Sequence, residues 1–254
     1  KSLLLYAEQG LGDTLQFCRY VPMLQAQGAR VSLAVQAPLV SLLVGQWPGV
    51  DVAESFADTS AFDLATPLMS LPLALGTTLE SIPAEVPYLR ATQNKAPSLT
   101  KTVRPRVGLV WSGSTGHKND KNRSISVAAL APLFGLPVDW VCLQPDLREA
   151  DLAWLDDHPD VIIERPELKD FAETARMIAG LDLVVTVDTA VAHLAGALGK
   201  AVWILLPTGA DYRWLLDRTD SPWYPSARLF RQKSRGDWPA VIAEVRNAIL
   251  ADNP

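Results

Sequence analysis

The stretch that decides the fold is LVVTVDTAVAHLAGALGKAVWILL, residues 183–206. Its first five residues are apolar or β-branched, so they predict a short strand that is buried on both faces. Asp188 and Thr189 are good helix N-caps, and the alanine-rich run after them favours a helix that a glycine ends. Residues 201–206 predict a second buried strand. The pattern is a βαβ unit, and its turn lies at the carboxyl end of a parallel strand, where open α/β sheets bind ligands.

The turn of this unit favours an anion site. The free N–H groups and the dipole of a helix N-terminus attract anions, phosphate above all. Thr189 and His193 are four residues apart, so they lie on one helix face above Asp188. Two interpretations stay open: a capped helix start with a core histidine, or a pocket ringed by a carboxylate, a hydroxyl and an imidazole. His193 is one of three histidines and lies on the site face, which favours the pocket.

Composition narrows the class of protein. The 254 residues can form one large or two small domains, and 48% hydrophobic with 20% charged residues is ordinary for a globular protein. The net charge of −5 argues against a general nucleic-acid binder, and no apolar run is long enough to span a bilayer. Two cysteines, Cys18 and Cys142, predict buried thiols and fit a cytoplasmic protein. The chain starts in a strand without an initiator Met, so we expect it to be the end of a longer polypeptide.

The first part of the chain, residues 1–95, predicts a small parallel α/β domain because short strands alternate with helices. We expect strands at 3–7, 29–35, 50–53 and 62–65, and helices at 12–27, 38–44 and 67–75. Pro22 should interrupt the first helix. The proline-rich and polar segment 91–105 is typical of an interdomain linker.

Two glycines, Gly10 and Gly12, follow the first strand, so a ligand can approach the backbone there. Leu15 stands where a dinucleotide fingerprint has its third glycine, which disfavours a dehydrogenase with a standard NAD site. Asp13 lies at the mouth of the sheet. It either stabilises the first turn of the helix through the dipole or acts as a general base towards a substrate hydroxyl.

Residues 106–235 predict a second parallel α/β domain. We expect strands at 106–111, 139–143, 161–163, 183–187, 201–206 and 227–230, and helices at 126–134, 148–156, 171–181 and 190–198. A last amphipathic helix follows a cap at Asp237. Asp157 and His158 form a helix-ending turn rather than a metal site. The aromatic and charged loop 207–225 either packs over a bound base or sugar or covers the surface.

The loop 112–124, SGSTGHKNDKNRS, follows the first strand of the second domain and combines small residues and hydroxyls with three cations against one Asp. Small residues allow backbone approach, hydroxyls donate to phosphate oxygens, and cations neutralise them. The ending of a Walker A loop is absent. The loop is therefore either a phosphate site of another kind or a solvated polar loop.

Four runs carry a resemblance to a known family: GLGDTLQF at 10–17, WSGSTGHKNDKNRS at 111–124, VTVDTAVAHLAGALGKAVWILLP at 185–207 and DSPWYPSARLFRQ at 220–232. Together they resemble glycosyltransferase family 9, the heptosyltransferase-like family, over nearly the whole chain. The closer likeness is to bacterial proteins that carry this module after tetratricopeptide repeats, which implies such repeats upstream.

The resemblance implies a GT-B fold: two Rossmann-like parallel-sheet domains that face a cleft, with a C-terminal helix, 236–254, crossing back to the first domain. It implies a metal-independent, inverting transfer of a heptose or related sugar from a nucleotide-diphosphate donor, ADP-linked or similar, to a hydroxyl of a saccharide or protein acceptor, without a cofactor. Asp13 would be the catalytic base. The remaining positions carried over are Gly10, Gly12 and Gln16 on the acceptor side; Ser112, Gly113 and Ser114 near the donor phosphates; Lys118, Lys121 or Arg123 as the cation; and Asp188, Thr189, Ala190 and His193 along the donor site.

A different class of function also fits these residues. A non-catalytic nucleotide-sugar-binding module of a repeat-containing scaffold protein would share the donor site but would not need Asp13. Donor binding without sugar transfer would favour that alternative.

Overall fold

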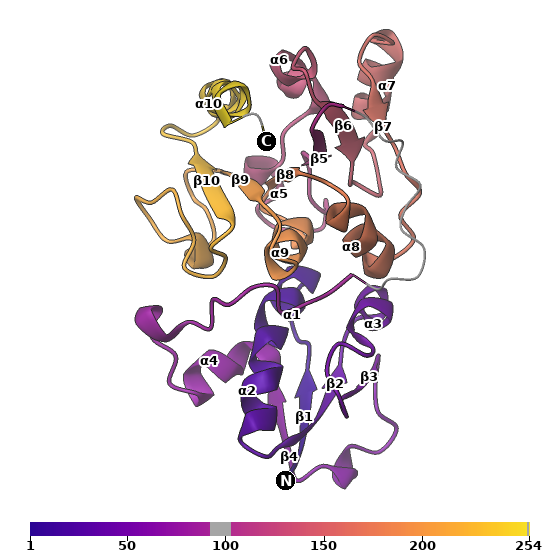
Figure 1. Cartoon of the computed structure of the whole chain (residues 1–254), viewed down its shortest axis with the longest axis vertical. Helices are drawn as coiled ribbons and strands as arrows, with labels where there is room; N and C mark the ends of the chain where they lie inside the picture. Colours follow the sequence, from indigo (N-terminus) through magenta and orange to yellow (C-terminus); the bar gives the residue numbers. More distant parts are fainter. Residues whose placement is uncertain (92–102, 253) are drawn as a thin grey trace.

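The computed structural model describes residues 1–91, 103–252 and 254. It contains two sheets, and every strand pair within them is parallel. The four-stranded sheet has the order β3-β2-β1-β4, and the six-stranded sheet has the order β10-β9-β8-β5-β6-β7. Figure 1 shows the smaller sheet at one end of the molecule and the larger one at the other, with helices α1 and α9 between them.

The smaller sheet takes its strands from the first part of the chain, as the alternation of short apolar runs predicts. Pro22 interrupts the first helix as expected: α1 ends, one 3-10 turn follows, and α2 begins with the proline in its first turn. The elements are β1 Ser2–Tyr6, α1 Leu11–Phe17, η1 Cys18–Tyr20, α2 Val21–Ala26, β2 Arg30–Ala34, α3 Ala37–Leu43, β3 Asp51–Ala53, η2 Thr59–Ala61, β4 Leu64–Pro67, η3 Leu68–Ser70, α4 Leu71–Ala74 and η4 Leu79–Ser81.

The larger sheet is built around the βαβ unit of the deciding stretch, whose two strands are buried along their whole length. The loop 112–124 contains one helical turn that the sequence did not predict, α5. The elements are β5 Arg106–Val110, α5 Asp120–Arg123, η5 Val127–Leu130, α6 Ala131–Phe134, β6 Asp139–Cys142, α7 Glu149–Asp157, β7 Ile163–Glu164, α8 Phe171–Ala179, β8 Leu183–Val187, α9 Ala190–Ala197, β9 Val202–Leu206, η6 Tyr212–Trp214, β10 Ala227–Arg231 and α10 Trp238–Asp252.

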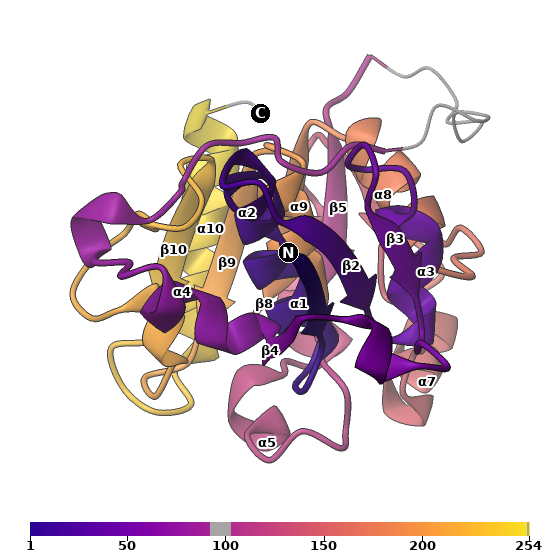
Figure 2. The same cartoon turned by 90° about the horizontal axis from the view of Figure 1, so that it is seen from below.

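One hydrophobic core contains buried side chains from both halves of the molecule. Its buried side chains include Leu5 and Leu15 from the smaller half and Leu194 and Ile204 from the larger half. The contact between α1 and α9 joins the two halves, and the view from below places these helices behind β1 (Figure 2). A second apolar cluster covers the other face of the larger sheet. The small sheet therefore does not form a core of its own.

The C-terminal helix does not cross back to the first domain, so the expectation for residues 236–254 is wrong. Helix α10 packs on β10, α6 and η5, and it lies at the far end of the molecule from the smaller sheet (Figure 1). Its apolar stripe, which includes Val241, Val245 and Ile249, is buried in the outer cluster of the larger sheet. The helix follows edge strand β10 through a short turn, so this nearest apolar face already covers the stripe.

The described residues before 92 end the smaller half, and those after 102 begin the larger half. The backbone N–H groups of Tyr88 and Leu89 donate to the carbonyl of Ala197 at the end of α9, at 3.0 and 3.2 Å. Most of the linker expected at 91–105 lies outside the described residues. The domain boundaries 1–95 and 106–235 stay predictions.

A buried arginine fastens the same junction. Arg19 is 3% exposed and donates to the carbonyls of Pro83 and Trp223, at 3.2 and 2.8 Å, and to the hydroxyl of Tyr88, at 3.1 Å. Its guanidinium also lies over the ring of Tyr224, 4.8 Å from the centroid. Arg19 thus ties η1 to the segment that leaves the smaller sheet and to the loop that follows β9.

Both cysteines are free and buried, as predicted. Burial raises the pKa of the Cys18 thiol to about 12 and that of Cys142 to about 11, so both stay protonated. None of the helices in the described ranges combines the length and the hydropathy of a bilayer-spanning segment.

Candidate functional site

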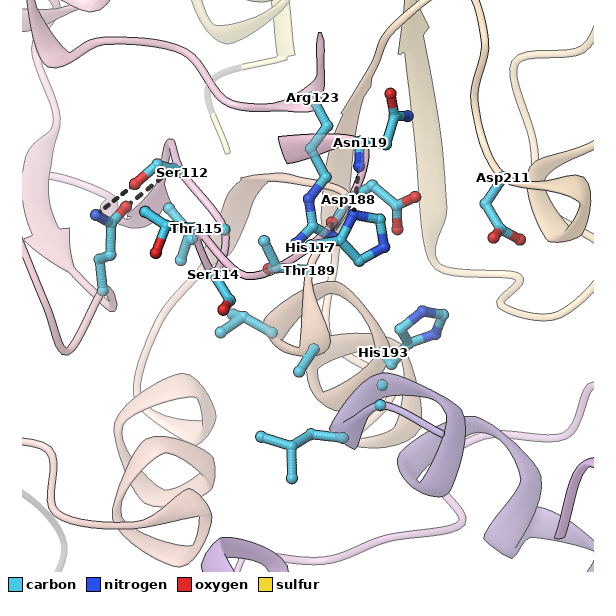
Figure 3. A pocket seen from close by; sticks show the side chains of 18 of the residues that line it. Ser112, Ser114, Thr115, His117, Asn119, Arg123, Asp188, Thr189, His193 and Asp211 are labelled. Carbon is cyan, nitrogen blue, oxygen red and sulfur yellow. Dashed lines mark hydrogen bonds between the residues drawn. The ribbon is translucent and has the colours of Figure 1, made fainter. Parts of the chain in front are cut away.

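A cavity of about 1000 Å³ lies between the two halves of the molecule, at the carboxyl ends of β1, β5 and β8. Residues 10–13, after β1, line one part of its wall, and the larger half supplies the remainder. Figure 3 shows the loop 112–124 and the start of α9 facing the same space. The structure therefore brings together most of the positions that the sequence singled out.

The N-terminus of α9 opens onto this cavity. Thr189 is the N-cap, but its side chain makes no capping hydrogen bond and instead contacts the hydroxyl of Thr186 at 3.2 Å. Among the residues that the structure describes, no side chain therefore accepts from the first N–H groups of the helix, which suits these groups to an anion. Asp188, Thr189 and Ala190 line the wall of the cavity, and burial raises the pKa of the Asp188 carboxyl.

His193 combines the two interpretations of the sequence. It lines the cavity, yet it is only 2% exposed, and its Nδ1 lies 2.9 Å from the hydroxyl of Tyr224. Its ring stacks on Trp214, with 5.4 Å between centroids. Burial holds the pKa of His193 well below its ordinary value, so the ring is neutral and acts as a hydrogen-bonding group rather than a cation.

Position 12 requires a glycine for a reason other than the expected approach of a ligand to the backbone. A Cβ added there would lie 2.7 Å from Cδ2 of His193 and 3.6 Å from Cα of Ala190. Gly12 therefore allows α1 to approach α9, besides lining the cavity.

The cation of the loop 112–124 at the cavity is Arg123. Its Nη1 donates to the carbonyl of Asp188 at 2.8 Å, and its guanidinium covers Gly113, where a Cβ would lie 2.5 Å from Nη2. Lys118 and Lys121 are exposed and do not line the cavity, so the structure does not place them at the site.

Gln144, the second residue after β6, holds the start of this loop. Its Oε1 accepts from the backbone N–H of Ser112 at 3.0 Å, and its Nε2 donates to the Ser112 hydroxyl at 2.8 Å. Ser112, Gly113 and Ser114 all line the cavity. Gln144 was not predicted, although a polar residue at the carboxyl end of a parallel strand is the signal that would have found it.

Asp13 uses both carboxylate oxygens. Its Oδ2 accepts from the backbone N–H of Gly10 at 2.8 Å, which is the helix-capping role, and its Oδ1 accepts from Nη2 of Arg213 at 2.5 Å. Arg213 comes from the loop after β9 and also lies 3.2 Å from Asp211. The sequence did not single out Arg213 or Asp211 as site residues, although both belong to the aromatic and charged loop 207–225.

Gln16, which was expected on the acceptor side, lies inside the protein. It is fully buried, does not line the cavity, and its side-chain amide atoms have no hydrogen-bond partner among the described residues. It lies in α1, three residues after Asp13, but its side chain is packed inside the protein. Within the described ranges, no cluster of three or more His, Cys, Asp or Glu side chains is arranged to hold a metal ion.

Residues 166–205 match the family model of glycosyltransferase family 9 (heptosyltransferase). Protein FlbA from Caulobacter vibrioides is 30% identical over 278 residues, which cover 98% of this chain and 46% of FlbA. The chain therefore spans about half the length of this curated relative.

Two solved structures share the fold. A glycosyl transferase family 9 protein from Veillonella parvula has a TM-score of 0.68 at 12% identity, over 100% of this chain and 97% of the other. The iron-containing dodecameric glycosyltransferase TibC from enterotoxigenic E. coli H10407 has a TM-score of 0.63 at 13% identity, over 100% of this chain and 78% of TibC. TibC was also solved as a heptosyltransferase in complex with ADP-D-β-D-heptose.

At such identities these structures establish the fold, which is the GT-B arrangement of two parallel sheets about a cleft. The matched segment 166–205 contains α8, β8 and α9, and with them the open helix N-terminus of the cavity. The resemblance to glycosyltransferase family 9 is thus confirmed for residues 166–205, which match the family model and border the cavity, and for the fold, which is shared with solved members of that family.

Proposed function

We propose that the chain is a glycosyltransferase that moves a sugar from a nucleotide-diphosphate donor to an acceptor hydroxyl. The observation that carries this proposal is that Asp13 and the open N-terminus of α9 line one cavity, although they belong to different halves of the molecule. A base that faces an anion-binding wall is what transfer from a diphosphate requires.

In this reaction Asp13 takes the proton of the acceptor hydroxyl while the acceptor oxygen forms a bond to the anomeric carbon. The bond between that carbon and the diphosphate oxygen breaks, and the diphosphate leaves with the electron pair. The N–H groups of α9 and the guanidinium of Arg123 stabilise the leaving charge. A single displacement of this kind inverts the configuration at the anomeric carbon.

We propose an ADP-linked heptose or a related sugar as the donor, because TibC, which shares the fold, was solved with ADP-D-β-D-heptose. We also propose that no metal ion or cofactor is needed, since Arg123, Arg148 and Arg213 supply positive charge to the cavity wall. TibC is iron-containing, so this point has its own test: transfer should persist after chelation with EDTA.

The acceptor is proposed to be a saccharide or a protein. We also propose that tetratricopeptide repeats lie upstream, as the resemblance implies, and that the protein is cytoplasmic.

The test combines binding and transfer. Calorimetry should find one tightly bound nucleoside diphosphate among ADP, UDP and GDP. Replacing Asp13 by Asn should lower turnover by roughly 10²–10⁴-fold, as expected when a general base is lost. It should not weaken binding of the nucleoside diphosphate. The exposed Asp51→Asn is the matched control and should leave turnover unchanged. Unchanged turnover in Asp13→Asn would refute the role of Asp13.

One observation favours the alternative, a non-catalytic nucleotide-sugar-binding module: both oxygens of Asp13 are already hydrogen-bonded. Binding of a nucleotide sugar without transfer or hydrolysis across a broad acceptor panel would support that alternative.

A further inference from the structure

A buried ion pair crosses the cavity from one half of the molecule to the other. Nη2 of Arg213 lies 2.5 Å from Oδ1 of Asp13, and the two side chains are 10% and 19% exposed. Arg213 belongs to η6, in the loop after β9, whereas Asp13 belongs to α1, in the smaller half. The proposed base is therefore occupied by a guanidinium that the sequence places far away from it.

The loop holds Arg213 beside the anion-favouring turn. Trp214, the next residue, is fully buried and stacks on His193 in α9. Leu215, which ends η6, has a φ of 55°, a left-handed conformation that a leucine adopts only when its surroundings impose it. The position of Arg213 is thus set from both sides by packing and backbone.

Arg213 also has a second carboxylate within reach. Its Nη1 lies 3.2 Å from Oδ1 of Asp211, and the same oxygen accepts from the backbone N–H of Arg213 at 3.1 Å. Asp211 belongs to the same loop as Arg213, so it remains beside Arg213 when the ion pair with Asp13 breaks. Breaking the pair with Asp13 therefore does not leave the guanidinium without a countercharge.

The charges along the cavity wall favour an exchange of partners. The wall carries four carboxylates, those of Asp13, Asp146, Asp188 and Asp211, and three guanidiniums, those of Arg123, Arg148 and Arg213. Arg148 already donates to Asp120 at 2.7 Å. A diphosphate brings more than one negative charge, and its oxygens match the fork of a guanidinium. Arg213 is the cation whose transfer to the diphosphate also frees the proposed base.

We propose that Arg213 binds the diphosphate of the donor and that, before the donor binds, Arg213 is paired with Asp13. Arrival of the donor then releases Oδ1 of Asp13 towards the acceptor hydroxyl, so the base is free only when a sugar is present to be transferred. This inference rests on the proposed function for the identity of the base and deepens it by naming a second diphosphate-binding residue.

The experiment measures binding of ADP, UDP and GDP by calorimetry to the wild type, Arg213→Met, Asp13→Asn and the double variant, using the nucleotide that the wild type binds most tightly. Arg213→Met should weaken binding by roughly 10- to 100-fold, because a hydrogen bond to a charged group is lost. Asp13→Asn should tighten binding several-fold, because Arg213 no longer has to leave a carboxylate. The double variant should stay as weak as Arg213→Met.

Arg218→Met is the matched control. Arg218 is on the same loop, pairs with the exposed Asp220 and does not line the cavity, so its removal should leave binding unchanged. Arg213→Lys keeps the charge without the fork and should bind with intermediate affinity. It serves as the test variant if Arg213→Met does not fold.

Three results would overturn the inference: wild-type affinity in Arg213→Met, no tightening in Asp13→Asn, or wild-type affinity restored in the double variant. The last would mean that Arg213 acts only by neutralising Asp13. Any of these beside intact sugar transfer leaves the proposed function standing. If the expected binding pattern is found but no sugar is transferred, the proposed transferase function is refuted, whereas the role of Arg213 in binding the diphosphate stands. A wild type that binds no nucleoside diphosphate would overturn both.

Discussion

His193 is the residue at which stability and the site are most closely linked. Its ring is buried between Tyr224 and Trp214, and burial lowers its pKa well below the ordinary value. In the unfolded chain the same side chain titrates near pH ~6.5. Above that pH both states hold a neutral ring, whereas below it only the unfolded state gains a proton.

This difference predicts a loss of stability as the pH falls below about 6.5, approaching about 1.4 kcal/mol per pH unit. Urea unfolding of the wild type and of His193→Gln between pH 7.5 and 5.5 measures it. The variant will be less stable at every pH, but its free energy of unfolding should fall less steeply by close to that slope. Parallel curves for the two proteins would contradict a neutral, buried His193.

At the residue scale, the sequence predicted which residues line the cavity better than it predicted which side chains they contact. Asp13, Thr189 and His193 could be found because each stands at the end of a strand or in the first turns of a helix, where parallel sheets bind ligands. Arg213 could not, since its partner Asp13 is distant in sequence and only the fold brings them together. Lys118 was included on charge alone, and charge does not say which way a side chain points.

Helix α8 shows how one element joins the two halves. Its N-cap, Asp170, accepts from the backbone N–H of Glu173 at 2.8 Å and from the hydroxyl of Ser41 on α3, also at 2.8 Å. These hydrogen bonds contribute to a pKa for Asp170 below the ordinary value, against the opposing effect of burial. The cap therefore stabilises the helix and its contact with the smaller half.

Asp170→Ala should lower the free energy of unfolding by about 1–2 kcal/mol, the usual range for a lost N-cap. Asp170→Asn keeps an acceptor for Glu173 and should retain most of that stability. Ser41→Ala removes only the hydrogen bond of Asp170 to the smaller half, so its loss of stability should be smaller than that of Asp170→Ala. Chemical denaturation of the three variants gives the order, and an Asp170→Ala as stable as the wild type would rule out the capping role.

Elements with a clear apolar pattern were predicted to within a few residues. The strands at 183–187 and 106–111 and the helix at 190–198 are examples, because buried parallel strands and an alanine-rich helix have distinct patterns. Helix α5 was missed, since DKNR has no apolar periodicity. The place of α10 was also wrong: its stripe shows that one face is buried but does not say against which sheet.

At the scale of the whole molecule, Arg19 joins three segments through its hydrogen bonds to Pro83, Tyr88 and Trp223 and its own place in η1. Without it the carbonyls of Pro83 and Trp223 and the hydroxyl of Tyr88 would lose a donor at a largely buried junction. Leaving buried acceptors unpaired destabilises a fold by about 1–3 kcal/mol each where water does not replace the donor.

Arg19→Met, which keeps much of the apolar stem, should therefore lower the free energy of unfolding by at least about 2 kcal/mol. The matched control is Arg246→Met, on the exposed side of α10, which should change stability by no more than about 0.5 kcal/mol. Urea denaturation followed by tryptophan fluorescence measures both. Equal stabilities of the two variants would show that the buried guanidinium is not needed at the junction.

The core that passes through both sheets limits how the molecule can move. Hinge bending, which opens and closes many two-lobed proteins, would here pull α1 away from α9 and expose leucines and alanines that now exclude water. A small shift of the loop 112–124 disturbs far less apolar surface, because none of its residues belongs to either buried cluster. A nucleotide would thus reach its place by displacing side chains at the rim, and the lobes themselves would behave as one rigid frame.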